Sequence, residues 1–277
     1  MNRSYLLLVC FVITQSIAQN NSVTSLKSKA NFPIGSSIRF VPFMKDTKLK
    51  SLQQHHFDSY TAGSDMKMYQ IAPKPGVFRW ERIDSIVAYT KKNNQRLFGH
   101  TLIWHSATPK WIEKKAKKDP AWLEGFMKNY IQTYIKKYKG IVHGWDVVNE
   151  GLNTKGAGFR TESIWHKTMG QSYIEKAFRY AHEADPNAVL FYNDFNIERD
   201  TLKFNTMMKM VEDFQQRDVP ISGIGFQMHI RMDIPNEIIA YTLKRAADTG
   251  LQMHLSEVDS IFNTHDDSTG GGMAADN

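Results

Sequence analysis

The chain has 277 residues, 42% hydrophobic and 23% charged, with a formal net charge of +7. This is an ordinary globular composition, sufficient for one sizeable core. The densest basic runs, at residues 114–118 and 136–139, lie in segments with helical apolar spacing and are interpreted as solvated helix faces. A nucleic-acid groove is the alternative, but no recognisable nucleic-acid-binding motif accompanies these runs.

The first 18 residues predict a signal peptide. Arg3 supplies the positive charge, residues 6–13 form a short apolar run, and small residues precede a cleavage position near Ala18. The apolar run is too short to span a membrane, so we expect a protein that is exported, either secreted or periplasmic. Cys10 lies in this run, so the mature chain has no cysteine and no disulfide. Residues 19–31 are polar and are expected to form a flexible lead-in.

From residue 32 onward, short apolar runs alternate with longer stretches of helical periodicity. Gly140, Asp185-Pro186 and Gly250 mark helix ends. The predicted strands are Ser37–Val41, Ser59–Thr61 (the weakest), Arg96–His100, Gly144–Val148, Val189–Asn193, Gly223–Gln227 and Leu251–Ser256. The clearest amphipathic helices are predicted at Trp122–Tyr138, Tyr173–Ala184, Leu202–Gln216 and Asn236–Thr249.

Strand alternating with helix favours a parallel sheet with crossover helices. Seven such units fit a closed barrel of eight better than an open sheet, so the predicted fold is an α/β (β/α)8 TIM barrel over residues 32–277. Residues 262–277 include the run Ser268–Gly272 and show no apolar periodicity. No segment there qualifies as the eighth strand or the last helices, so we expect a barrel that is incomplete at the C-terminus.

Polar residues gather where the predicted strands end, which is where a TIM barrel carries its functional groups. Glu150 ends the fourth strand and Glu257 follows the seventh. Glycoside hydrolysis needs two such carboxyls: one protonates the leaving oxygen, and the other attacks the anomeric carbon or activates water. Retaining enzymes hold them about 5–5.5 Å apart, a spacing that opposed strand ends can meet. The alternative, two solvated loop glutamates, is disfavoured because carboxylates beside apolar strand residues need hydrogen-bond partners.

Five segments at or near the predicted strand ends form an ordered set of motifs. They are Gly99–His105 (G-H-T-L-I-W-H), Trp145–Glu150 (W-D-V-V-N-E), Tyr192–Asn196 (Y-N-D-F-N), Gly223–His229 (G-I-G-F-Q-M-H) and Leu255–Asp259 (L-S-E-V-D). In this order they resemble the motifs of glycoside hydrolase family 10, the endo-β-1,4-xylanases, and the resemblance covers roughly residues 35–262. It implies a retaining endo-1,4-β-xylanase that acts on xylan or a related plant cell-wall polysaccharide without a cofactor.

The resemblance also implies a role for each matching residue. Glu150 would be the acid/base, and Glu257 the nucleophile that forms a glycosyl-enzyme. Asn149 would hydrogen-bond the sugar 2-hydroxyl, and His229 would bridge Glu257 and Asp259 so that both orient the nucleophile. The remaining expected substrate contacts are Lys67, His100 and Trp104 on the non-reducing side of the cleft, together with Gln227.

The chain departs from the family pattern at two places. Where the family has E-N-x-M-K-W, residues 63–68 read G-S-D-M-K-M, and Ala107 stands where Gln is frequent. The family's Glu and Asn bind the −2 xylose, so weaker or altered binding is expected on the non-reducing side. The family's eighth strand carries a tryptophan that caps the −1 sugar, and this chain has no counterpart.

Three other interpretations remain open beside the xylanase. The chain could be a catalytically impaired carbohydrate-binding relative, or a β-glycanase of the same barrel clan with another substrate. His100, His105 and His229 could converge on zinc, but no H-E-x-x-H motif or cysteine pair supports this, so no metal is predicted. We also expect no nucleic-acid partner and a monomer.

Overall fold

The computed structural model describes residues 24–261. The predicted signal peptide, residues 19–23 and the tail 262–277 lie outside the described residues. The rest of the expected lead-in includes η1 (Leu26–Ser28), which lies against the end of α2 (Thr47–His56). Ser25 Oγ donates to the carbonyl of His55 at 2.6 Å, and Lys27 Nζ donates to that of Gln54 at 2.7 Å. Ser25 and Lys27 are therefore hydrogen-bonded to α2, and the flexibility expected for residues 19–31 stays a prediction.

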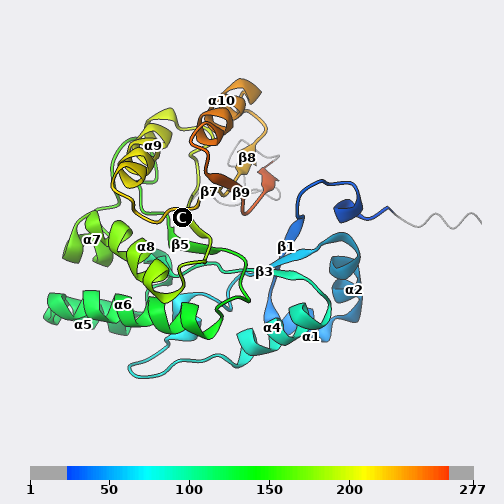
Figure 1. The fold of residues 1–277 in the computed structure, drawn as a ribbon, viewed down its shortest axis with the longest axis horizontal. Helices are drawn as coiled ribbons and strands as arrows, with labels where there is room; N and C mark the ends of the chain where they lie inside the picture. The colour runs from blue at the N-terminus through cyan, green and yellow to red at the C-terminus, as the bar shows by residue number, and fades with distance from the viewer. Residues whose placement is uncertain (1–23, 262–277) are drawn as a thin grey trace, which may run out of the picture.

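The strands form a parallel series in chain order (Figure 1). One sheet has the order β1-β2-β3 and a second has the order β4-β5-β6-β7-β9. The bridge between Gly99 and Trp145 connects them, because it continues β3 alongside β5. The bounds are β1 (Gly35–Ile38), β2 (Ser59–Ala62), β3 (Arg96–Phe98), β4 (Ile103–Trp104), β5 (Trp145–Asn149), β6 (Leu190–Asp194), β7 (Gly223–Phe226) and β9 (Gln252–Leu255).

This series is the wall of a TIM barrel that is open on one side. Within residues 24–261, no strand pairs with the outer edge of β1 or of β9. Near that opening, β8 (His229–Arg231) and β10 (Asp259–Ile261) form a separate parallel pair. The register matches Asp259 with His229, which brings the segments after β7 and β9 together.

The helices lie outside the strands, as crossover connections require (Figure 1). Within the described chain, no helix has both the length and the apolar character needed to cross a membrane. The remaining helices are α1 (Phe40–Lys45), α3 (Met68–Ile71), α4 (Glu81–Lys92), η2 (His105–Ala107), α5 (Lys110–Lys118), α6 (Pro120–Lys137), α7 (Ile164–Met169), α8 (Ser172–Ala184), α9 (Thr201–Gln216) and α10 (Asn236–Ala247).

The predicted elements are found with small shifts at their ends. The first strand stops at Ile38 rather than Val41, because α1 begins at Phe40. Pro42 does not prevent that helix, since the first turn needs no backbone N–H from it. The third strand ends at Phe98 instead of His100. The four helices named from the sequence correspond to α6, α8, α9 and α10.

The barrel centre is filled by aromatic rings that require glycine opposite them. The ring of Phe98 lies 5.5 Å from that of Phe191 and 4.1 Å from that of His254. A Cβ on Gly223 would come within 2.2 Å of the Phe191 ring, and one on Gly144 within 2.8 Å of the Phe98 ring. These two glycines therefore let the strands close around the rings, and the polar strand ends rest on this packed layer.

Candidate active site

Glu150 is aimed by the way its strand ends. All five residues of β5 are buried, and the next residue, Glu150, takes a left-handed backbone conformation with φ +56°. Its N–H donates to the carbonyl of Asn193 at 2.9 Å, and its carbonyl accepts from Arg160 Nε at 3.1 Å. A left-handed backbone is costly for a residue with a Cβ, so these contacts hold an unfavourable turn in place.

The Glu150 carboxylate is hydrogen-bonded by two amides. Its Oε1 accepts from Gln227 Nε2 at 3.1 Å and from Asn149 Nδ2 at 3.2 Å. The same Gln227 nitrogen also donates to Asn149 Oδ1 at 3.2 Å. Gln227 and Asn149 are almost completely buried. Side chains from β5 and from the end of β7 therefore fix one oxygen of this glutamate.

Asn193, the fourth residue of β6, links this group to Glu257. Its Nδ2 donates to Asn149 Oδ1 at 2.9 Å and to Glu257 Oε1 at 3.4 Å. Its Oδ1 accepts from Ser256 Oγ at 2.8 Å. A Cβ on Gly225 would lie only 2.3 Å from that oxygen, so β7 requires glycine there. One continuous hydrogen-bond network thus joins the two glutamates across four strand ends, and we call these groups the amide network: Asn149, Glu150, Asn193, Gln227, Ser256 and Glu257.

Glu257 also contacts a histidine that is held by a second carboxylate. His229 Nε2 lies 3.7 Å from Glu257 Oε2, and His229 Nδ1 lies 3.0 Å from Asp259 Oδ2. Partial burial raises the pKa of Glu257 above its usual value, whereas positive charge on His100 and His229 lowers it. The bridging position expected for His229 is present, and its role in orienting the nucleophile stays a prediction.

His100 is held by Asp146, a residue that was not among the predicted site residues. His100 Nδ1 lies 2.8 Å from Asp146 Oδ2, and both side chains are buried. A charged residue inside the apolar strand sequence W-D-V-V was the signal that could have identified Asp146, because a buried carboxylate needs a partner.

Lys67 and Trp104 lie together on the side of the barrel that carries Glu150 and Glu257, which we call the active-site mouth. The Lys67 ammonium is 4.5 Å from the centre of the Trp104 ring. Burial lowers the pKa of Lys67, while the negative charges of Glu257 and Glu150 raise it. Lys67 therefore lies within electrostatic reach of both glutamates. The structure brings together all the site residues predicted from the sequence.

The three histidines considered for zinc make separate contacts. His100 faces Asp146, and His229 lies between Asp259 and Glu257. His105 Nε2 lies 3.0 Å from Ser106 Oγ, and burial followed by the charge of Arg160 lowers the pKa of His105.

Asp65 anchors residues 63–68, the segment whose sequence differs from the family pattern. Its Oδ2 accepts from the backbone N–H of Phe40 at 2.7 Å, and its Oδ1 accepts from Arg82 at 3.0 Å. A Cβ on Gly63 would come within 2.8 Å of Ser37 Oγ, the free end of a short side chain. The end of β2, near Lys67, is thus followed by the small residues Gly63 and Ser64.

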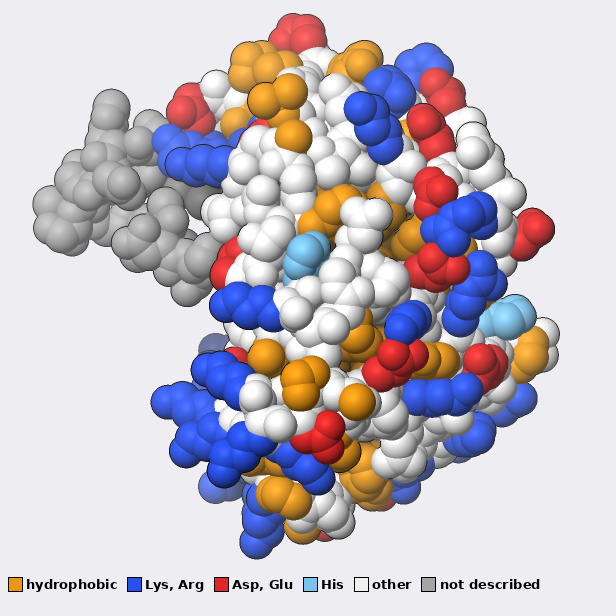
Figure 2. Space-filling model, turned by 90° about the vertical axis from the view of Figure 1, so that its left-hand side faces the viewer, with side chains coloured by type: hydrophobic (Ala, Val, Ile, Leu, Met, Phe, Trp, Pro, Cys, Tyr) orange, Lys and Arg blue, Asp and Glu red, His pale blue; other side chains and the backbone are white. Residues whose placement is uncertain are grey.

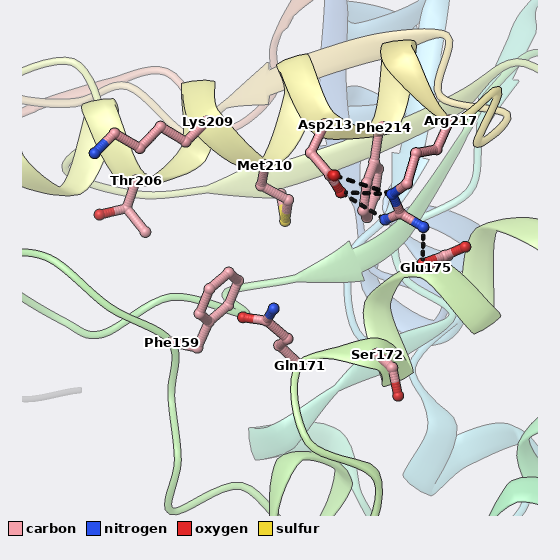
Figure 3. Close-up of a pocket in the computed structure, with 10 residues that line it drawn as sticks. All are labelled: Phe159, Gln171, Ser172, Glu175, Thr206, Lys209, Met210, Asp213, Phe214 and Arg217. Atoms are coloured by element: carbon pink, nitrogen blue, oxygen red, sulfur yellow. Dashed lines mark hydrogen bonds and ion pairs between the residues drawn. The ribbon is translucent and has the colours of Figure 1, made fainter.

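A hollow of about 330 Å³ lies away from these strand ends, between α8 and α9 (Figure 3). Phe159 and Gln171 point into it from below α9, and Arg217 at one end is held by Asp213 and Glu175. Its lining shares no residue with the amide network. It is therefore not part of the candidate active site.

Comparison with known proteins gives one family. The family described as "Glycosyl hydrolase family 10" matches residues 23–274. "Endo-1,4-beta-xylanase C" of Paenibacillus barcinonensis is 38% identical over 90% of this chain, which spans 25% of that protein. "Beta-1,4-xylanase" of Dictyoglomus thermophilum is 35% identical over 94% of this chain, which spans 74% of that protein. The first of these relatives is thus much longer than the chain.

Solved structures agree in fold. Xylanase10C of Cellvibrio japonicus, in its E385A mutant form with xylopentaose bound, superposes with a TM-score of 0.83 at 34% identity. The superposition covers 90% of this chain and 52% of that one.

Proposed function

The chain belongs to glycosyl hydrolase family 10, and from that premise we propose that it is a retaining endo-1,4-β-xylanase. Two relatives at 35–38% identity carry the name of xylanase, and a related structure holds xylopentaose. The substrate we assign is therefore xylan, or a closely related plant cell-wall polysaccharide.

In the first step, the Glu257 carboxylate attacks the anomeric carbon while Glu150 gives its proton to the departing glycosidic oxygen. The C–O bond of the substrate breaks and an ester to Glu257 forms. In the second step, water attacks the same carbon, Glu150 takes a proton from that water, and the ester breaks. The configuration is retained because two inversions occur.

The division of roles follows from what surrounds each carboxyl. Burial raises the pKa of Glu257, and the charges of His100 and His229 oppose that rise, which favours the ionised form that a nucleophile needs. Glu150 instead faces two neutral amides, Asn149 and Gln227, which donate to a single oxygen and leave the other for the leaving group. Asn149, between the two carboxyls, is placed to bind a hydroxyl of the bound sugar.

The observation that carries the proposal is the unbroken amide network between the two glutamates. A protein that only binds sugar has no need of two carboxyls tied to one set of amides, so this network disfavours the binding-only relative. The small residues Gly63 and Ser64 favour a second candidate, a β-glycanase with different demands at the non-reducing side. Product analysis on xylan, mixed-linkage glucan and carboxymethyl cellulose separates these two.

The test compares reducing-sugar release from xylan by the parent chain and by Glu257→Gln. We expect release by the parent and a loss of at least about 10³-fold in the variant, because the covalent step is removed. Glu150→Gln is the matched variant: it should keep measurable glycosylation on an aryl xyloside with a good leaving group, since that group needs no proton. A well-folded parent that releases no sugar contradicts the proposal.

We further propose that the protein is exported, with cleavage near Ala18, and that it acts as a monomer. The charged, apolar and small-residue regions of residues 1–18 support export. N-terminal sequencing of the secreted protein and its sedimentation test the two statements.

A further inference from the structure

Helix α5 carries five lysines and one acidic residue within nine positions. Lys110, Lys114, Lys117 and Lys118 are spaced i, i+4, i+7 and i+8, so they lie along one face about 12 Å long. All four are exposed, whereas Ile112 and Ala116 on the opposite side are buried. We call these four residues the α5 lysine face.

The α5 lysine face is unneutralised, unlike the lysines around it. Neighbouring lysines pair with acids, as in Lys176 with Glu124 at 2.6 Å and Lys137 with Asp84 at 3.1 Å. Among the described residues, none of these four lysines forms an ion pair with an acidic side chain. Like charges four residues apart destabilise a helix, and Lys110 is also at the helix N-terminus, where a cation is unfavourable. A bound anion would relieve both costs.

Aromatic packing keeps the helix that carries this face in place. The fifth lysine, Lys115, lies 4.4 Å from the centre of the Trp122 ring, which stacks on Phe126 at 5.0 Å. Trp111, the second residue of α5, also packs here, with its ring 5.8 Å from that of Trp122. Its Nε1 donates to the carbonyl of Ala72 at 2.9 Å. The helix is therefore fixed from both sides, and an anion would meet a preformed surface.

The same contacts connect the face to the active-site mouth. Ala72 caps the C-terminus of α3, which begins directly after Lys67, and α5 begins six positions after Trp104. Lys67 and Trp104 line the mouth together. Through Trp111 and Ala72, α5 is thus hydrogen-bonded to the segment that follows Lys67. Figure 2 views the molecule from the side where α5 lies in Figure 1 and shows Lys and Arg side chains gathered at its lower end, with hydrophobic side chains between them.

We propose that the α5 lysine face binds the carboxylates of an acidic polysaccharide, the uronic-acid-bearing form of xylan whose backbone occupies the cleft. This rests on the proposed function, because it extends the same substrate beyond the cleft. A neutral polymer would gain little from four ammonium groups, whereas carboxylates repeated along a chain match charges repeated along a helix. The half-buried rings of Trp111 and Trp122 add an apolar border suited to the C–H faces of sugars.

The test measures binding of uronic-acid-bearing xylan and of the same polymer after its carboxyl groups have been reduced to alcohols. Affinity electrophoresis at low salt is suitable, with every protein in a Glu257→Gln background so that the polymer is not cut. We expect the acidic polymer to bind about tenfold more tightly than the reduced one. The variant Lys110→Gln/Lys114→Gln/Lys117→Gln/Lys118→Gln should lose this preference, and the corresponding four-arginine variant should keep it.

A matched control removes the same charge elsewhere. Lys45, Lys48, Lys91 and Lys92 are exposed on α1, α2 and α4, on the other side of the molecule in Figure 1. Changing these four to Gln should leave the preference intact. Equal binding of both polymers by the parent, or equal loss in the control, overturns the proposal. Stronger competition by a DNA duplex than by the acidic xylan overturns the choice of polysaccharide.

Hydrolysis of xylohexaose separates this inference from the proposed function. That substrate is linear and uncharged, so the α5 lysine-face variant, in the otherwise unchanged chain, should cleave it at the parental rate. If the parent cleaves xylohexaose but shows no preference for the acidic polymer, the xylanase proposal is supported and the proposal for the α5 lysine face is overturned. If nothing is cleaved but the preference is present, the enzymatic proposal fails alone.

Discussion

At the residue scale, the ionisation of Glu257 is set by two opposing effects. Its side chain retains 35% of its surface, yet partial burial still raises its pKa, and Asp146 and Glu150 add to this. Positive charge on His100 and His229 acts in the other direction. The two histidines that lower the pKa of Glu257 are themselves hydrogen-bonded or ion-paired to Asp146 and Asp259.

We therefore predict that His229→Gln shifts the acid side of the pH–rate profile to higher pH. Removal of the positive charge raises the pKa of Glu257 further, so a higher pH is needed to ionise it. The rate at the optimum should also fall about 10- to 100-fold, because Glu257 loses a positioning contact. The measurement is kcat/KM against pH on a soluble xylo-oligosaccharide, with Asp259→Asn as a companion variant. An unchanged acid limb would show that His229 carries no charge relevant to Glu257.

At the element scale, a fully buried ion pair ties the start of α9 to the end of β6. Lys203 Nζ lies 2.7 Å from Asp194 Oδ1, and both side chains have 0% exposure. Tyr192 Oη donates to the other Asp194 oxygen at 2.6 Å. Burial raises the pKa of Asp194, and the charge of Lys203 opposes that rise. The pair fixes the strand that carries Asn193, so it supports the amide network from behind.

We predict that Lys203→Met lowers the free energy of unfolding by about 3–5 kcal/mol near neutral pH, because it leaves a buried carboxylate unpaired. Without Lys203 the folded-state pKa of Asp194 rises further above its unfolded value. A carboxyl with a raised folded pKa costs stability as pH increases from the unfolded towards the folded pKa. The deficit of the variant should therefore shrink as pH falls. Urea unfolding across pH measures it.

Lys203→Met combined with Asp194→Asn is the matched control. The double variant removes the unpaired charge, so it should recover part of the lost stability and lose the pH dependence. A single variant that is as stable as the parent at neutral pH would contradict this account of the pair.

The elements that the sequence could predict are those with a local signal. Short apolar runs identified seven of the eight strands in the parallel series, all except the two-residue β4. The polar residues that follow these strands identified Glu150, Gln227 and Glu257. The hydrogen bonds that connect those residues could not be predicted, because they depend on the register in which neighbouring strands pair. Asn193 faces both Asn149 and Glu257 only because β6 pairs with β5 in one particular register. The pairing of β8 with β10 likewise joins segments 30 residues apart without a marked strand pattern.

At the scale of the whole molecule, burial is uneven around the barrel wall. Every residue of β5 and β6 is buried, whereas three of the four residues of β9 are exposed. Glu150 follows a fully buried strand, whereas Glu257 follows the largely exposed β9. Local opening requires little loss of apolar contact at β9 and a large loss at β5.

Amide hydrogen exchange should therefore differ between the two halves of the site. We predict that a peptide covering residues 252–260 exchanges much faster than peptides covering 145–149 and 190–194. Addition of a xylo-oligosaccharide to Glu257→Gln should slow exchange in the first peptide most, since the ligand bridges the two halves. Equal protection of all three peptides in the free protein would contradict this. Mass spectrometry after timed exchange provides the measurement.

The amide network also limits which amino-acid substitutions this sequence can accept. Each of its members satisfies hydrogen bonds of at least one other, so the effect of replacing one depends on which residues occupy the other positions. Gly225 belongs to the same set, because any larger residue would displace Asn193. Chimeras that exchange whole barrels should keep their activity, whereas crossovers between β5 and β9 should often lose it. We therefore expect the network to tolerate replacement only when several of its members change together.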